Sequence, residues 1–97
     1  MTSTSNLSLP FIMPAQAQKH VTHNDALLVL DALVQLSVAS RQLSVPPNDP
    51  QTGERHIVAE GAGGLWTGVP AGHVAAFQDG AWRIFAPQAG WIAWIAD

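Results

Sequence analysis

Residues 15–25, AQAQKHVTHND, carry the side chains best suited to chemistry. His20 and His23 are two of the chain's four histidines, Lys19 is its only lysine, and the segment ends on Asp25. Two histidines and a carboxylate are a ligand set that zinc accepts. An HxxH pair is common by chance, however, and no second cluster of ligands stands out. We therefore predict no metal site and favour a structural role for this polarity.

No other constellation indicates an enzyme. Serine, histidine and aspartate are present, but no serine sits in the strained turn that exposes a catalytic nucleophile. The carboxylates Glu54, Glu60 and Asp79 fall in predicted turns or at strand ends, where solvated acids are the rule. The GAGG run at 61–64 lacks the Lys-Ser or Lys-Thr and the following helix of a phosphate loop. We predict no catalytic residue and no cofactor.

The chain is unusually apolar for its size. It has 97 residues, of which 47% are hydrophobic and 11% charged, against roughly 25% charged in a typical soluble domain. A domain this small buries only about 60% of the surface of its unfolded chain. The excess apolar surface predicts a subunit that buries it against partners.

The sequence also argues against membrane association, nucleic-acid binding and secretion. The longest unbroken apolar run, residues 91–96, is far shorter than the roughly 20 residues that span a bilayer. A net charge of −3 with four scattered Lys and Arg gives no electrostatic footprint for nucleic acid. The N-terminus lacks the basic start and apolar core of a secretory signal. We expect synthesis in the cytoplasm, no membrane association and no nucleic-acid binding.

The chain is expected to form one α+β domain with four segments. Residues 1–21 form an extended N-terminal arm, because Pro10 and Pro14 push their predecessors toward extended geometry. Residues 22–43 form one long apolar helix. Residues 44–54 form a proline-rich linker, and residues 55–97 form a small antiparallel β-meander of four or five strands.

The predicted helix is well signalled at its start and apolar around most of its circumference. Thr22 followed three residues later by Asp25 resembles a capping box, and Asn24 adds an acceptor near the positive end of the helix dipole. Gln16, Gln18 and His20 are expected to hydrogen-bond backbone at the joint between arm and helix. The arm and helix supply the candidate partner or oligomer interface: Leu9, Phe11, Ile12, Met13, Leu28, Val29, Leu33 and Leu36.

In the β half, Asp79-Gly80 predicts a two-residue type I′ hairpin within residues 73–87. That register pairs Phe77 with Trp82 and places both on one face, together with Ala75 and Ile84. We expect this face to be core. Short strands are also predicted at 55–61, around 65–69 and at 91–96.

Tryptophans support an alternative function. Aromatic rings exposed on a sheet can stack on sugars, and strand alternation predicts that Trp91 and Trp94 face opposite sides. Trp66, Trp91 and Trp94 are therefore candidate glycan contacts, as in a carbohydrate-binding module that attaches to a host-surface polysaccharide. The competing interpretation is that these rings are core or subunit-interface aromatics.

Three stretches together resemble a known family. LPFIMPAQAQKHVTHNDALLVLDALVQLSV, then PPNDPQTGERHIVAEGAGGLWTG and FQDGAWRIFAPQAGWIAWIAD, are similar to the DUF2793 proteins of prophages and gene transfer agents. The resemblance extends from Leu9 to the end of the chain. It implies a virion component associated with spikes or fibres, and it carries over no catalytic residue.

The resemblance and the composition agree on an oligomeric assembly subunit, and the resemblance implies that the assembly is a phage-like particle. The resemblance implies a head-spike or fibre base at a capsid vertex, with a capsid vertex protein and a spike fibre protein as partners. Association of the apolar helices around a symmetry axis predicts a homo-oligomer, a trimer or a pentamer. Because the chain stops at Asp97 without a fibre region, we expect an adaptor that joins capsid to fibre.

Overall fold

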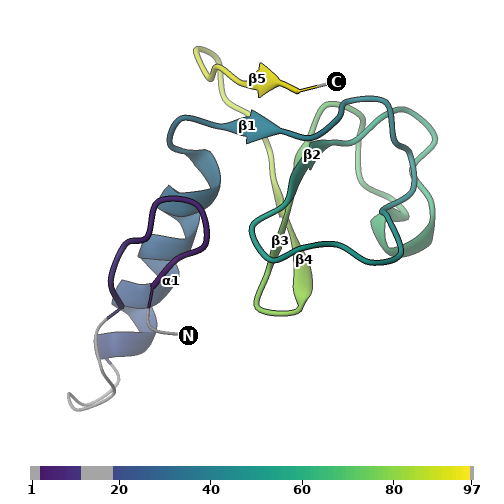
Figure 1. Ribbon diagram of the computed structural model, residues 1–97. Coiled ribbons are helices and arrows are strands. Elements are labelled where there is room, and N and C mark those ends of the chain that lie inside the picture. The colour runs from purple at the N-terminus through teal and green to yellow at the C-terminus, as the bar shows by residue number, and fades with distance from the viewer. Residues whose placement is uncertain (1–2, 12–18, 97) are drawn as a thin grey trace. The chain divides into compact units, whose positions relative to one another are not determined.

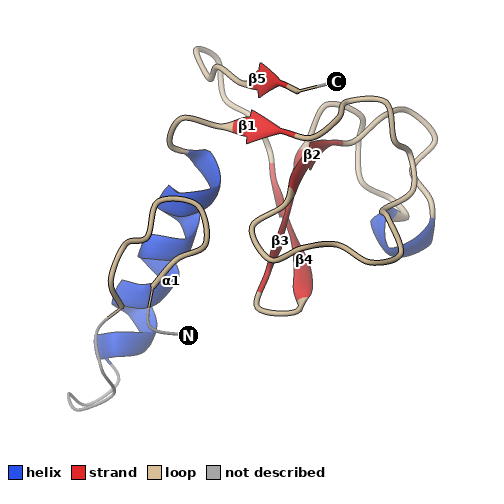
Figure 2. Cartoon of the chain, in the orientation of Figure 1, coloured by secondary structure: helices blue, strands red, loops and turns tan. Residues whose placement is uncertain are grey.

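The computed structural model describes residues 3–11 and 19–96 (Figure 1). The chain divides into two compact units, Met1–Val34 and Gln35–Asp97. One helix is followed by five short strands, so the predicted α+β class is confirmed (Figure 2). The elements are α1 (Lys19–Leu33), β1 (Ser37–Val38), β2 (Arg55–Ile57), the 3-10 turn η1 (Gly64–Trp66), β3 (Val74–Gln78), β4 (Ala81–Phe85) and β5 (Trp94–Ile95).

In the first unit, residues 3–10 form a closed loop rather than the predicted extended arm. Ser3 and Pro10 form an antiparallel bridge, and the Thr4 amide donates to the Leu9 carbonyl at 2.9 Å. The Leu9 amide in turn donates to Thr4 Oγ1 at 2.9 Å. The proline-based prediction failed because these contacts let the chain turn back on itself, with Ser8 in the left-handed region at φ 56°.

The loop is tied to α1 by a buried carboxylate. Asp31, only 1% exposed, accepts hydrogen bonds from the amide of Leu7 at 2.6 Å and from the amide of Asn6 at 3.0 Å. Two backbone donors on one carboxylate make a strong anchor, because hydrogen bonds to charged groups are roughly twice as strong as neutral ones. Figure 1 shows the loop lying along the helix.

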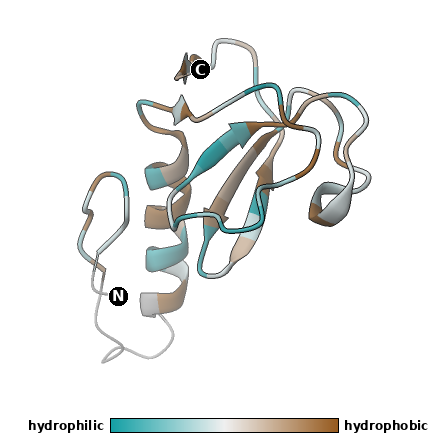
Figure 3. Cartoon of the chain, turned by 45° about the vertical axis from the view of Figure 1, so that its right-hand side comes forward, coloured by the Kyte–Doolittle hydropathy of each residue, from teal (hydrophilic) through white to brown (hydrophobic). Residues whose placement is uncertain are grey.

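Helix α1 is shorter at its C-terminal end than the predicted 22–43. It ends at Leu33, and Gln35 adopts the left-handed conformation, at φ 49°, that commonly terminates helices. Residues 37–38 form strand β1 instead of continuing the helix. Figure 3 shows hydrophobic bands recurring along α1 between polar ones.

In the second unit, the antiparallel sheet has the order β2-β3-β4, and β1 pairs with β5 in parallel. The prediction of a wholly antiparallel meander was wrong for that pair, in which Ser37 pairs with Trp94. The residue that follows β1 is hydrogen-bonded to β2, since the Ala39 amide donates to the Arg55 carbonyl at 2.8 Å. The element predicted around 65–69 is the turn η1 rather than a strand.

The β3–β4 hairpin has the predicted register, with Gln78 opposite Ala81 and Phe77 opposite Trp82. Asp79 and Gly80 both have positive φ, at 54° and 78°, as a type I′ turn requires. This local signal was sufficient because the turn alone fixes the register.

Both faces of β3 are buried, in two separate clusters, because successive side chains of a strand point to opposite sides. Val74 packs with Leu36 and Val38, and Ala75 packs with Val58 and Trp66. The predicted core face is therefore only partly core, since Ala75 is fully buried but Ile84 is 37% exposed.

Candidate functional site

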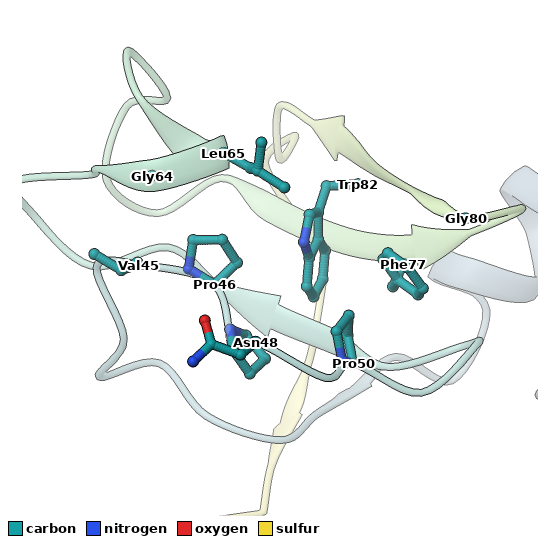
Figure 4. A pocket seen from close by; sticks show the side chains of 10 residues that line it. Val45, Pro46, Asn48, Pro50, Gly64, Leu65, Phe77, Gly80 and Trp82 are labelled. Carbon is teal, nitrogen blue, oxygen red and sulfur yellow. The ribbon is translucent and has the colours of Figure 1, made fainter.

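A hollow of about 420 Å³ opens between the proline-rich connector and the β3–β4 hairpin (Figure 4). We call it the Trp82 hollow. Its first wall is the connector, with Val45, Pro46, Pro47, Asn48 and Pro50. Its second wall consists of Gly64 and Leu65 from η1 with Phe77, Gly80 and Trp82 from the hairpin.

The connector wall is fixed by backbone hydrogen bonds at both ends. At its start, the Gly63 amide donates to the Ser44 carbonyl at 3.0 Å, and the Ala59 amide donates to the Leu43 carbonyl at 2.9 Å. At its end, the Gly53 amide donates to the Phe77 carbonyl at 2.8 Å. The prolines between these anchors have fixed φ angles. The wall is therefore set in shape before any ligand arrives.

A glycine lets the two walls meet at one edge of the hollow. Gly64 has φ 60°, and a Cβ at this position would lie 3.1 Å from Val45 Cγ1 and 3.5 Å from Pro46 Cδ. Only a residue without a side chain adopts this conformation and this approach at little cost.

Trp82 connects the hollow to an aromatic cluster. Its ring makes edge contacts with Phe77 and Trp66, at centroid distances of 5.1 and 5.2 Å, and with the ring of His56 at 5.9 Å. Edge-to-face contacts of this kind stabilise beyond the buried area alone. They hold the half-buried Trp82 indole in place, with Phe77 beside it (Figure 4).

Behind Trp82 lies a histidine–carboxylate pair. His56, 4% exposed, contacts Glu54 through Nε2 and Oε2 at 2.6 Å. His56 Nδ1 is buried and has no hydrogen-bond partner within the described part of the chain. With the Nε2 proton donated to Glu54, the pair fixes the imidazole orientation, and the ring serves as a wall of the cluster.

The chemistry of the hollow is that of a binding surface. None of its ten lining residues is charged, and Asn48 contributes the only polar side chain besides the Trp82 indole N–H. Aromatic, proline and aliphatic surfaces pack well against flat or ring-shaped apolar groups.

The predicted interface residues have different fates. Leu36 is 5% exposed and belongs to the core with Val38, so its assignment to an interface was wrong. That error follows from the wrong helix end. Leu9, Phe11, Leu28, Val29 and Leu33 are half-buried, and Ile12 and Met13 lie outside the described residues.

The predicted cap is not at the start of the helix. Because α1 begins at Lys19, Thr22, Asn24 and Asp25 lie within it, whereas an N-cap residue must flank the helix. Gln16 and Gln18 lie outside the described residues, as does the side chain of His20. His23 is exposed on α1. In the described part of the chain, no group of three or more His, Asp or Glu side chains could hold a metal ion.

The three tryptophans predicted as glycan contacts differ in exposure. Trp66 is fully buried and cannot offer its ring to a sugar, so that assignment was wrong. Trp91 and Trp94 are 40% and 73% exposed.

Among the described residues, no helix is both long and apolar enough to cross a membrane.

The comparison with protein families shows the family of the chain. The model described as "Protein of unknown function (DUF2793)" matches residues 23–97, well over half of the sequence. The chain belongs to the DUF2793 family. No curated protein and no solved structure matches it. The match confirms the resemblance to DUF2793 over residues 23–97, and the family description assigns no activity.

Sequence reasoning missed the Trp82 hollow of this DUF2793 protein. It placed Trp82 in the core and treated the prolines of the connector as a spacer. The signal available was the hairpin register, which sets Phe77 beside Trp82. The return of the connector across that face depends on backbone hydrogen bonds between residues 16 to 24 positions apart, such as Gly53 to Phe77, and no local pattern predicts them.

Proposed function

We propose that this protein is a structural subunit of a phage-like particle, either a gene transfer agent or a prophage virion. It serves as an oligomeric head-spike or fibre base and joins the capsid to the fibre. Its partners are further copies of itself, as a trimer or pentamer, a capsid vertex protein and a spike fibre protein. No catalytic step is part of this role.

The observation that carries the proposal is the apolar surface of α1 and the turn after it. Leu30 is 48% exposed and Val34 is 42% exposed. The Val34 amide donates to the Leu30 carbonyl at 2.8 Å, so the helical turn continues to Val34 and the two side chains lie on the same side. Val21 adds a further apolar side chain, 54% exposed. In a chain with 11% charged residues, such surface favours burial against another subunit. DUF2793 membership supports the particle setting through the resemblance described above.

Imaging of intact particles tests this role. Particles from a producing strain with and without the gene are compared by electron cryomicroscopy, and the protein is sought in the purified particles. We expect the protein to co-purify with the particles and the deletion to remove spikes from otherwise complete heads. Particles that lack the protein and keep every spike on deletion would rule the role out.

A second candidate function is attachment to a cell-surface polysaccharide. The exposed rings of Trp91 and Trp94 favour it, because exposed indoles stack on sugar rings. Binding of purified host polysaccharide is measured with the wild type, Trp91→Ala and Trp94→Ala. This function predicts loss of binding in one variant with unchanged assembly. Equal behaviour of all three proteins would exclude these rings as the contact.

A further inference from the structure

We propose that the Trp82 hollow binds an extended, uncharged, proline-containing peptide segment of a partner protein. The inference goes beyond the particle role and depends only on the hollow and its walls. The result of its test does not depend on how many copies of the chain assemble.

Charge and size define the class of ligand. With no charged residue among those lining it, the hollow offers no counter-charge to an ionic ligand, and burial of an unpaired charge is costly. Its volume of about 420 Å³ lies near the lower end of the range of ligand pockets, roughly 300–1,000 Å³. The complementary ligand is a small, neutral and largely apolar group, such as a short stretch of chain.

The walls favour a proline-containing segment over a sugar. Sugar hydroxyls require several hydrogen-bond partners, and the lining offers little beyond the Asn48 amide and the indole N–H of Trp82. Aromatic-lined grooves are instead a recurring way of binding polyproline II segments. Trp82 and Phe77 supply the aromatic surface here, and Pro46 faces them from the connector (Figure 4).

A polar group is placed to orient the peptide. Figure 4 shows the indole nitrogen of Trp82 on the side of its ring that faces Pro46. A polyproline II segment makes no internal hydrogen bonds, so its carbonyls are available to accept one. The Trp82 N–H is therefore positioned to donate to a carbonyl of a segment that lies between Trp82 and Pro46.

Preorganisation adds to affinity at this site. The backbone bonds at both ends of the connector and the edge contacts of Trp82 fix the walls in advance. A polyproline II ligand is itself stiff, so little conformational entropy is lost on either side.

The test is a titration of the full-length protein with a synthetic decaproline peptide. Binding is followed through the indole N–H signals of the four tryptophans in heteronuclear magnetic resonance spectra. We expect the Trp82 signal to shift in a saturable way, while the Trp91 and Trp94 signals stay in place. No shift of Trp82 at millimolar decaproline would overturn the proposal.

Two exposed positions, one leucine and one isoleucine, give a matched pair of variants, and we expect both to fold because neither side chain is buried. Leu65, 83% exposed, lines the hollow, and Ile92, 85% exposed, does not. Leu65→Glu is expected to weaken decaproline binding about tenfold or more, by placing a charge at an apolar contact, whereas Ile92→Glu leaves it unchanged. Equal effects of the two variants would contradict binding in the hollow.

A neutral trisaccharide, chitotriose, separates the peptide from a sugar. We expect chitotriose to leave the Trp82 signal in place under conditions in which decaproline shifts it. If chitotriose shifts Trp82 and decaproline does not, the hollow is a carbohydrate site and the proposal is wrong.

Discussion

Trp66 is the largest of the fully buried side chains and fills the space between Val58 and Ala75. Its position explains why a small unit with short strands holds together, since a single indole buries more apolar area than any other side chain. Trp94, in contrast, is 73% exposed and contributes mainly through the backbone of β5.

The two tryptophans therefore predict opposite results on truncation. Trp66→Ala removes the centre of a cluster and is expected to lower the free energy of unfolding by about 3–5 kcal/mol. Trp94→Ala is expected to change it by no more than about 0.5 kcal/mol, because its side chain packs little. Urea denaturation followed by circular dichroism measures both. Similar midpoints for the two variants would contradict the assigned burial.

Asp31 has the corresponding role in the first unit, where it anchors residues 3–10 through the amides of Asn6 and Leu7. Asp31→Ala leaves those amides without their carboxylate, at a cost of about 1.5–3 kcal/mol. Hydrogen exchange at the Asn6 and Leu7 amides is expected to accelerate roughly 10- to 100-fold as the loop opens. Asp49→Ala, which removes an exposed carboxylate of the connector, is the control. Unchanged exchange in Asp31→Ala would show that the loop is held by other contacts.

At the scale of elements, the features predicted correctly are those with local causes. The Asp79-Gly80 turn fixes the hairpin register by itself, and the prediction of that hairpin was confirmed. The helix end was wrong because residues 37–38 pair with Trp94 and Ile95, more than 50 positions away. Such pairing overrides the helical pattern that the apolar residues suggest locally. The loop at 3–10 was missed because the hydrogen bonds between Thr4 and Leu9 close it and because its anchor, Asp31, lies 25 positions from Asn6.

Gly64 tests whether the close approach of η1 to the connector matters. Gly64→Ala and Gly61→Ala each force a side chain into left-handed backbone, at φ 60° and 78°, which costs about 1 kcal/mol or more. Only the first also places a Cβ against Val45, since nothing lies within 4 Å of a Cβ at Gly61. We expect Gly64→Ala to be the less stable variant by roughly a further 1 kcal/mol and to weaken decaproline binding. Equal stabilities in thermal or urea unfolding would mean that the connector moves aside freely.

Across the whole molecule, the many apolar residues are divided between buried clusters and exposed surface. Some form the two clusters around β3, and others remain exposed on α1 and near β5, where Ile92 is 85% exposed. Composition predicted this excess of apolar residues correctly, but it could not locate it, because the positions left uncovered depend on which residues the sheets bury. The proposed function requires self-association through the exposed face of α1.

Light scattering of the purified 97-residue chain at micromolar concentration measures this self-association. We expect a mass of several chains, three or five, that falls toward one chain in Leu30→Glu, because a charge on the apolar face opposes its burial. Thr22→Glu, at an exposed polar position of the same helix, is expected to keep the wild-type mass. A wild-type mass of one chain, or equal masses for the wild type and Leu30→Glu, would contradict assembly through α1.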